Sequence, residues 1–255
     1  MRLIRYQAKK EPAQYGWVSN DRVGRIDGSP FGEFQRLEAT LPLDSVQLHA
    51  PIVPGKIICV GRNYSEHIKE QNADTPETPL LFFKPPSAVI GPMQTIILPP
   101  QSQQVDHEAE LVVVIGKRGR WIQPTDAFSY IYGYTIGNDI TARDLQRRDG
   151  QWTRSKGFDT FCPLGPWVET EFDPTDAMIT CHVNGELRQM ASTHDMIFHV
   201  DQIIAFASSI MTLEPGDVLM TGTPAGISPL HPGDVVEVTI DGLGKLHNPV
   251  AMEMQ

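Results

Sequence analysis

Two carboxylates stand one residue apart at the start of a strongly apolar run. The stretch "VDHEAELVVVIG", residues 105–116, places Glu108 and Glu110 directly before "LVVVIG". In a β-strand the side chains of residues i and i+2 lie on the same face, so both carboxylates are expected to project together. Like charges this close raise each other's pKa unless a cation lies between them. The pair indicates either a solvated strand start or half of a metal site.

A third acid extends this pattern. Asp139, in "GYTIGNDITARDLQ", ends a β-like run where a short helical segment begins. If that strand end lies beside Glu108 and Glu110, the three form an all-oxygen cluster, which suits Mg²⁺ or Mn²⁺ rather than zinc. His107 falls on the opposite strand face, as expected for a core or surface histidine. Asp106 shares the face of the glutamates and is a weaker ligand candidate.

Two further segments carry residues that could act as acids or bases. In "VGRNYSEHIKE", His67 and Glu70 stand three residues apart, which on a helix lets the carboxylate orient the imidazole as a general base for water. An exposed polar helical turn would have the same spacing. Lys156, in "WTRSKGFDTFCPLG", stands outside any run of charges. It would stabilise negative charge on a metal-bound substrate, or simply be a solvated surface lysine.

The composition narrows the classes of partner. The chain has 255 residues, a formal net charge of −10 and a pI near 5.2, which disfavours nucleic acid because phosphate binding needs a basic surface. A small-molecule partner is expected instead. No apolar signal region or apolar run of about 20 residues is found, so we expect a cytoplasmic protein without a membrane span. The three cysteines are expected to be free thiols, with Cys162 a less favoured candidate nucleophile.

The elements expected to position these residues are mostly strands. Residues 1–52 are expected to form a small N-terminal β domain, in which "SNDR" turns one strand into the next, and residues 53–255 a larger domain. Short β-rich segments fill the larger domain, and "HVNGEL" predicts a tight hairpin. The clearest helix is expected at 200–213. Because alternating helix and strand units are missing, the pattern predicts a β-rich α+β fold, a roll or sandwich with few helices.

Taken in order, the motifs resemble those of the fumarylacetoacetate hydrolase family of metal-dependent enzymes, and its single-module bacterial type in particular. The resemblance covers nearly all of residues 56–248. Its pieces are "GRNYSEHIKE", "LFFKPPSAVIGP", "HEAELVVVIGK", "GYTIGNDITARDLQ", "SKGFDTFCPLGPWV", "VNGELRQ" and "LMTGTPAGI". It implies the mixed β-sandwich roll of the family's C-terminal domain, with a small N-terminal β domain at 1–52 and a catalytic β-roll domain at 53–255. It also implies a homodimer.

The resemblance further implies roles for individual residues. The binding of Mg²⁺ or Mn²⁺ falls to three carboxylates: Glu108, Glu110 and Asp139. Catalysis falls to a lysine beside the metal and a water-activating pair: Lys156, His67 and Glu70. The positions that match substrate contacts are Arg143, Gln146 and Thr223.

Family members that resemble the chain include 2-hydroxyhepta-2,4-diene-1,7-dioate isomerases, acylpyruvate hydrolases and oxaloacetate decarboxylases. The resemblance implies cleavage of a carbon–carbon bond in a small 2-oxo or 2,4-dioxo acid through a metal-stabilised enolate, by acylpyruvate hydrolysis or oxaloacetate-type decarboxylation, and a place in aromatic catabolism. The alternative is an isomerase or tautomerase of a 2-hydroxydienoate or oxo-dicarboxylate.

A non-catalytic oxo-acid binding module is the alternative from a different class of protein. Such a module would have no need of Lys156 as a catalytic group.

The polar stretch "KEQNADTPETP" at 69–79 contains two prolines and predicts a loop that could close over the site as a lid. An ordinary surface loop would have the same composition.

Overall fold

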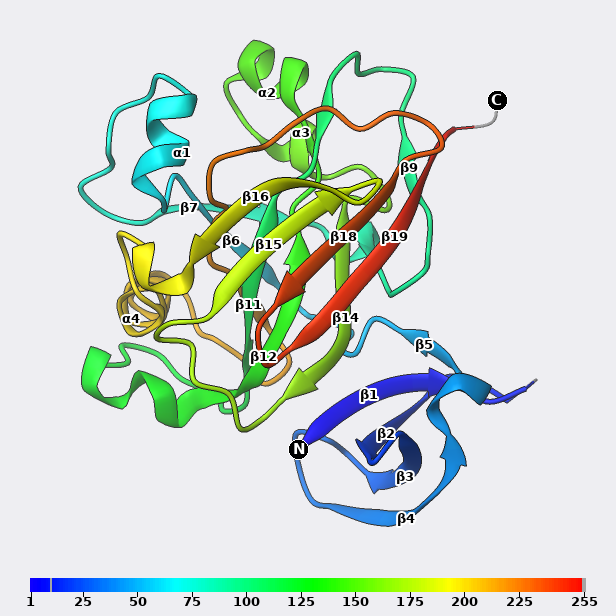
Figure 1. Ribbon diagram of the computed structural model, residues 1–255. Helices are drawn as coiled ribbons and strands as arrows, with labels where there is room; N and C mark the ends of the chain where they lie inside the picture. Colours follow the sequence, from blue (N-terminus) through cyan, green and yellow to red (C-terminus); the bar gives the residue numbers. More distant parts are fainter. Residues whose placement is uncertain (10, 254–255) are drawn as a thin grey trace.

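A twelve-stranded mixed sheet forms the larger layer of the protein in a computed structural model that describes residues 1–9 and 11–253. The order along the sheet is β4-β3-β2-β1-β14-β12-β11-β17-β6-β7, with β5 paired to β1 and β8 to β14 (Figure 1). Its strands are β1 (Arg2–Gln7), β2 (Gln14–Ser19), β3 (Arg22–Gly28), β4 (Phe34–Pro42), β5 (Gln47–His49), β6 (Ile57–Gly61), β7 (Leu80–Lys84), β8 (Val89–Ile90), β11 (Ala109–Ile115), β12 (Ile131–Asn138), β14 (Cys162–Glu169) and β17 (Val218–Met220). The chain is therefore strand-rich, with mixed sheets, as expected.

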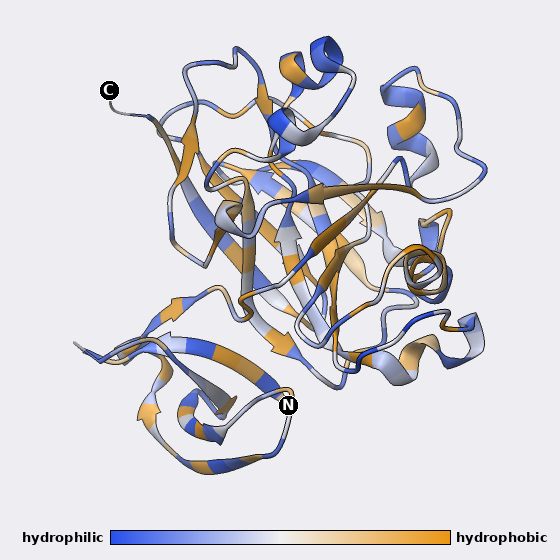
Figure 2. Ribbon diagram, turned by 180° about the vertical axis from the view of Figure 1, so that it is seen from behind, coloured by the Kyte–Doolittle hydropathy of each residue, from blue (hydrophilic) through white to orange (hydrophobic). Residues whose placement is uncertain are grey.

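A second sheet of five strands packs against the first, with β18 beside β12 and β19 beside β14. In order its strands are β16 (Glu186–Ser192), β15 (Met178–Val183), β18 (Val235–Ile240), β19 (Gly244–Met252) and β9 (Ile96–Leu98). A small two-stranded sheet consists of β10 (Val105–Asp106) and β13 (Thr141–Ala142). Figure 2 shows hydrophobic residues concentrated along the central strands of these layers.

Strand β11 explains why the run "LVVVI" is continuously apolar. Leu111 and Val113 belong to the core between the two sheets, whereas Val112 and Val114 belong to a second core on the opposite face. Since successive side chains of a strand point to opposite faces, a strand buried on both faces must be apolar at every position. The carboxylates at the start of this run are consequently held by a strand that is packed on both faces.

Four α-helices lie among the described residues. They are α1 (Ser65–Glu70), α2 (Arg143–Asp149), α3 (Thr153–Lys156) and α4 (Val200–Ile210), and short 3₁₀ turns cover Leu43–Ser45, Pro86–Ala88, Pro124–Tyr130 and Thr193–Asp195. The helix expected at 200–213 is present but ends at Ile210. Figure 1 shows α1, α2 and α3 together at one end of the sheets, and the N-terminal strands at the other end. No helix of the described chain is both long and apolar enough to cross a membrane.

Both hairpins expected from the sequence are present. Asn20 and Asp21, between β2 and β3, have φ angles of 49° and 56°, and Asn184 and Gly185, between β15 and β16, have φ angles of 53° and 80°. Two consecutive positive φ angles are the requirement of a type I′ turn, which Asn, Asp and Gly tolerate best.

The N-terminal strands have a small core of their own and also continue the large sheet. Ile4, Tyr6, Val18 and Val23 form the core of β1–β3. However, β1 pairs with β14 through Arg2 opposite Glu169 and Leu3 opposite Val168. The division of the chain into domains at residue 52 therefore stays a prediction, because backbone hydrogen bonds connect its two sides.

Candidate active site

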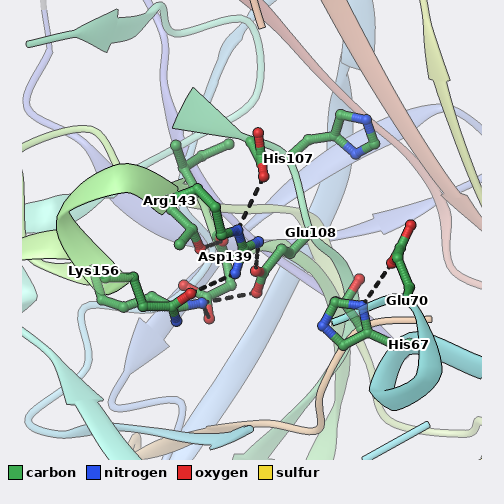
Figure 3. A network of polar contacts seen from close by, with 12 residues as sticks. His67, Glu70, His107, Glu108, Asp139, Arg143 and Lys156 are labelled. Carbon is green, nitrogen blue, oxygen red and sulfur yellow. Dashed lines mark hydrogen bonds and ion pairs between the residues drawn. The ribbon is translucent and has the colours of Figure 1, made fainter. Parts of the chain in front are cut away.

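The register of two antiparallel strands brings the three predicted carboxylates together. Strand β11 pairs with β12 so that Ala109 lies opposite Asn138 and Glu110 opposite Gly137, and the same register sets Glu108 opposite Asp139. The backbone N–H of Asp139 donates to the Glu108 carbonyl oxygen at 2.8 Å. One carboxylate oxygen from each of Glu108, Glu110 and Asp139 lies within 4.8 Å of the other two. Figure 3 shows Glu108 and Asp139 beside Lys156 and Arg143.

Burial makes this concentration of negative charge costly unless cations are present. Glu108, Glu110 and Asp139 are 4%, 1% and 0% exposed. Burial would raise the pKa of Glu108, but Lys156 and Arg143 lower it far below its usual range. For Glu110, burial together with the charges of Asp139 and Glu108 raises the pKa well above its usual value. Glu110 is the carboxylate of the cluster that no lysine or arginine of the described chain pairs with.

Two lysines reach the cluster. Lys156, at the end of α3, donates to Glu108 Oε2 at 2.8 Å and to Asp139 Oδ2 at 2.6 Å, and its ammonium lies 4.9 Å from the centre of the Phe82 ring. Lys84, at the end of edge strand β7, donates to Asp139 Oδ1 at 2.5 Å and to the Ile140 carbonyl at 3.1 Å. Sequence reasoning missed Lys84, although an isolated lysine ending the apolar run "LLFFK" was a signal for a buried cation.

Lys84 changes the charge balance of the site. The sequence predicts three carboxylates, one lysine and one divalent cation, close to neutrality. With two buried lysines, charges of −3, +2 and +2 leave the cluster at +1 once the cation is bound. The inner end of the site is thus better suited to an anion than the sequence indicated. Burial would lower the pKa of Lys156, but Asp139 and Glu108 outweigh burial and raise it.

Arg143 opens helix α2 and is held by acids on two sides. Its Nε donates to Asp106 Oδ2 at 3.0 Å, its Nη2 donates to Glu108 Oε1, and its Nη1 donates to Gln146 Oε1 at 2.6 Å. Asp106, the weaker ligand candidate, therefore serves as the partner of Arg143. The guanidinium is fixed in place and retains donors for a further anion.

The predicted pair on α1 forms as expected from its spacing. His67 Nδ1 lies 3.0 Å from Glu70 Oε2, and the second carboxylate oxygen of Glu70 accepts from the Gly226 backbone N–H at 3.1 Å. The His67 side chain is 7% exposed and that of Glu70 is 31% exposed. Within the described chain no group hydrogen-bonds His67 Nε2, so this nitrogen can accept or donate a proton in the cavity.

Thr223 is held by a buried glutamine. Its hydroxyl donates to the Ala109 carbonyl at 2.9 Å and accepts from Gln189 Nε2 at 2.8 Å. Gln189 Oε1 accepts from the Ala109 N–H at 3.0 Å and lies 3.0 Å from His107 Nδ1. Figure 3 shows His107 pointing away from the carboxylates, and its Nε2 lies 2.9 Å from Ser228 Oγ. Thr223 can accept one more hydrogen bond, but it can donate one only by releasing Ala109.

Most of these residues line one cavity of about 310 Å³. Eight of the nine predicted site residues line it, the exception being Glu70, which acts on the cavity through His67. The 69–79 segment contributes Gln71 to the lining; Lys69 and Glu70 belong to α1, and residues 71–79 form neither helix nor strand. Closure of this segment over the site stays a prediction.

The donor set of the cluster fits a hard divalent cation. All three groups are buried carboxylates. Burial and two neighbouring negative charges raise the pKa of Glu110, and a bound cation would offset this repulsion. The backbone N–H of Gly222 holds Glu110 Oε2 at 2.8 Å, which leaves the other oxygen of this carboxylate for a metal. The cluster can therefore hold a metal ion.

The cysteines offer no alternative chemistry. Cys59, Cys162 and Cys181 are free and buried, as expected. Burial raises the pKa of Cys162 to about 12, so its thiol remains protonated near neutrality and is a poor nucleophile.

The strand-rich roll and its buried cluster of acids and lysines agree with a known family of enzymes. The sequence model for the fumarylacetoacetate (FAA) hydrolase C-terminal family matches residues 56–251, and a model for the Rv2993c-like N-terminal family matches residues 1–51. The chain belongs to the fumarylacetoacetate hydrolase family, whose members are enzymes.

Several relatives are similar over most of the chain. The protein Rv2993c of Mycobacterium tuberculosis is 48% identical over 240 residues, covering 93% of this chain and 91% of the relative. The mitochondrial oxaloacetate tautomerase FAHD2B of Bos taurus is 46% identical over 223 residues, covering 82% of this chain and 71% of the relative. The crystal structure of a 2-hydroxyhepta-2,4-diene-1,7-dioate isomerase from Mycobacterium marinum superposes with a TM-score of 0.93 at 41% identity and covers both chains completely.

Proposed function

We propose that this protein is a divalent-metal-dependent enzyme that transfers protons at the carbon next to the carbonyl of a small 2-oxo acid, interconverting keto and enol forms or double-bond isomers. The observation that carries the proposal is the shared cavity, in which the carboxylate cluster, Lys156 and the His67 ring meet. A substrate held there would have a cation, an ammonium and a base within reach of adjacent atoms.

Glu108, Glu110 and Asp139 would hold the metal, and their oxygen-only donor set favours Mg²⁺ or Mn²⁺. When bound, such a cation supplies a Lewis acid that stabilises negative charge on the substrate oxygens. Glu110 gains most from it, because no described lysine or arginine pairs with this carboxylate.

The protein side chains divide the remaining tasks. Lys156 supplies a second positive charge and a proton donor where the 2-oxo oxygen becomes negative. Arg143 is fixed by Asp106 and can orient the substrate carboxylate. His67 Nε2 can take the proton from the neighbouring carbon and return it, while Glu70 holds the ring in place through Nδ1. Tautomerisation needs nothing further, since the proton that leaves carbon is replaced by one on oxygen.

Cleavage of a carbon–carbon bond is the second candidate. The His67–Glu70 pair also suits activation of a water molecule, which hydrolysis of an acylpyruvate requires. Decarboxylation of an oxaloacetate-like acid would use the same stabilised negative charge. We place tautomerisation or isomerisation first because relatives with those names cover most of this chain.

One panel of assays separates these reactions. Purified protein with Mg²⁺ or Mn²⁺ is given enol oxaloacetate, a 2-hydroxydienoate dicarboxylate and acetylpyruvate, while the ultraviolet absorbance of the enol and the release of pyruvate are followed separately. Loss of the enol signal without pyruvate supports the first candidate, and metal-dependent release of pyruvate supports the second. Catalysis of none of these reactions would refute both.

A binding module remains the contrasting class, and Lys156 discriminates it. If Lys156→Ala leaves turnover intact while Glu110→Ala abolishes only ligand binding, the assigned role of the lysine is wrong. The homodimer, the cytoplasmic location and the place in aromatic catabolism stay predictions.

A further inference from the structure

Two arginines that are partly or fully exposed, Arg62 and Arg147, line the cavity, and neither pairs with a carboxylate of the described chain. Arg62 directly follows β6 and has a φ of 57°, in the left-handed region that non-glycine residues rarely occupy. Among the described residues it forms no hydrogen bond or ion pair. Residues held in such conformations cluster at functional sites, where the surrounding structure maintains them.

Packing around the adjacent residue fixes the position of Arg62. A Cβ atom at Gly61 would lie 2.8 Å from the Trp152 ring, so this glycine allows the chain to pass directly against the tryptophan. Trp152 is itself packed edge-on against Phe82, with ring centres 5.0 Å apart. The backbone that carries Arg62 is thereby held against the aromatic wall of the cavity.

Arg147 reaches the same cavity from helix α2. It lies four residues after Arg143, which places it on the same helix face and about 6 Å farther along the axis, away from the start of α2 beside Glu108. Arg147 is exposed, and the hydrogen bond found for it is a long one of 3.4 Å to Gln104 Oε1. Its charge is therefore available to a ligand.

The three cations beside the carboxylate cluster differ from Arg62 and Arg147, because each of the three is paired. Lys84, Lys156 and Arg143 each pair with a carboxylate of the cluster, and Arg143 pairs with Asp106 as well. The carboxylates that line the cavity are the three of the cluster. Among the described residues no carboxylate forms an ion pair with Arg62 or Arg147, so the positive charges of these two arginines remain unpaired in the cavity.

We infer that Arg62 and Arg147 form a second anion subsite, which binds the distal carboxylate of a 2-oxo dicarboxylate whose 2-oxo acid end lies at the cluster. This inference rests on the proposed function and deepens it, because it names the substrate class and the residues that select it. A cavity of about 310 Å³ is at the small end for ligand sites and fits an acid of a few carbon atoms.

The test compares two acids that differ by one terminal carboxylate, 2-oxobutanoate and 2-oxoglutarate. Calorimetric titration of the Mg²⁺-loaded protein should show that the dicarboxylate binds about tenfold to a hundredfold more tightly, as expected for charge-assisted hydrogen bonds to an arginine. The double variant Arg62→Ala with Arg147→Ala should lose this preference and bind 2-oxobutanoate as before. Arg62→Lys should retain part of it.

Arg148→Ala is the matched control. Arg148 neighbours Arg147 on α2, is exposed, and pairs with Asp149 instead of lining the cavity. It should keep the full preference of the unmodified protein. If the Arg62 and Arg147 variants weaken both acids equally, or neither, the subsite is wrong while the proposed function stands. If the unmodified protein binds neither acid, the subsite is wrong, and the assays with enol oxaloacetate, a 2-hydroxydienoate dicarboxylate and acetylpyruvate decide the proposed function separately.

Discussion

The inner and outer halves of the site differ in the burial of their residues and in the elements that carry them. The inner half consists of the cluster Glu108, Glu110 and Asp139 with Lys84 and Lys156, all at most 4% exposed and all connected by ion pairs or strand register. The outer half consists of His67 and Glu70 on a six-residue helix and of arginines on a turn and on a helix surface.

The difference separates two requirements of such an enzyme. Stabilising charge on a 2-oxo acid needs fixed groups in a dry environment, and the inner half is carried by central strands with buried neighbours. Choosing a substrate falls to the outer half, where Glu70, Arg62 and Arg147 are partly or fully exposed. Helix α1 is too short to be stable alone and is held by the burial of Ile68 and the contact of Glu70 with Gly226.

Removal of divalent cations should break the inner half and have the largest effect. Without a cation, Glu110 is a buried carboxylate beside two others, so exhaustive EDTA treatment should abolish activity and lower the melting temperature. Mg²⁺ or Mn²⁺ should restore both. Glu110→Gln should lose the increase in melting temperature caused by the metal. Full activity of the metal-free protein would contradict the assignment of the cluster.

Lys156→Met tests the group closest to the developing charge. We expect kcat/KM to fall by about 10²–10³, the cost of removing one preorganised donor. Lys69→Met provides the control, because Lys69 is 71% exposed on α1 and pairs with Glu66. Steady-state kinetics of both variants should differ by that factor, and equal kinetics would remove Lys156 from the chemistry.

Lys84→Met should separate stability from chemistry within the inner half. Its removal leaves the Asp139 carboxylate without the closer of its two lysines, so we expect a loss of about 3–5 kcal/mol in the free energy of unfolding. Activity at saturating Mg²⁺ should fall only about tenfold to a hundredfold, as for residues that support metal ligands. Urea unfolding and kinetics would be compared with Lys245→Met, a change at a 62% exposed lysine of β19. An unchanged unfolding free energy would show that Lys84 is not needed to balance Asp139.

Glu70→Gln probes the outer half and should have the smallest effect. Glutamine can keep the contacts to His67 and Gly226 but removes the negative charge beside the His67 ring. We expect turnover to fall by roughly tenfold, with the melting temperature nearly unchanged because Glu70 is partly exposed. Glu66→Gln on the same helix is the control. A large loss of stability would mean that this pair is structural.

Local sequence patterns predicted the features that depend on a single strand, helix or turn. Strand parity grouped Glu108 with Glu110, helical spacing paired His67 with Glu70, and the Asn-Gly pair at 184–185 predicted its hairpin. The predicted helix at 200–213 was too long by three residues, since the periodicity of its apolar residues does not specify where the last turn ends.

Contacts between distant segments could not be predicted from local patterns, because they depend on the order of the strands in the sheet. Lys84 reaches Asp139 because β7 pairs with β6 and β6 with β17 beside β11, an order that no local pattern specifies. Gln189 was missed for the same reason, since it joins β16 to the turn after β17 and to the start of β11.

The sequence by itself determined the strand-rich fold class, the family and the acidic side chains of the site, because these depend on periods of two and 3.6 residues and on motifs in a fixed order. Only the tertiary structure decided which cations balance those acids and which remain unpaired. Charge compensation in a buried site acts through space at a few ångströms. Strand order and side-chain packing bring Lys84 to the cluster, while Arg62 lines the cavity without an ion pair in the described part of the chain.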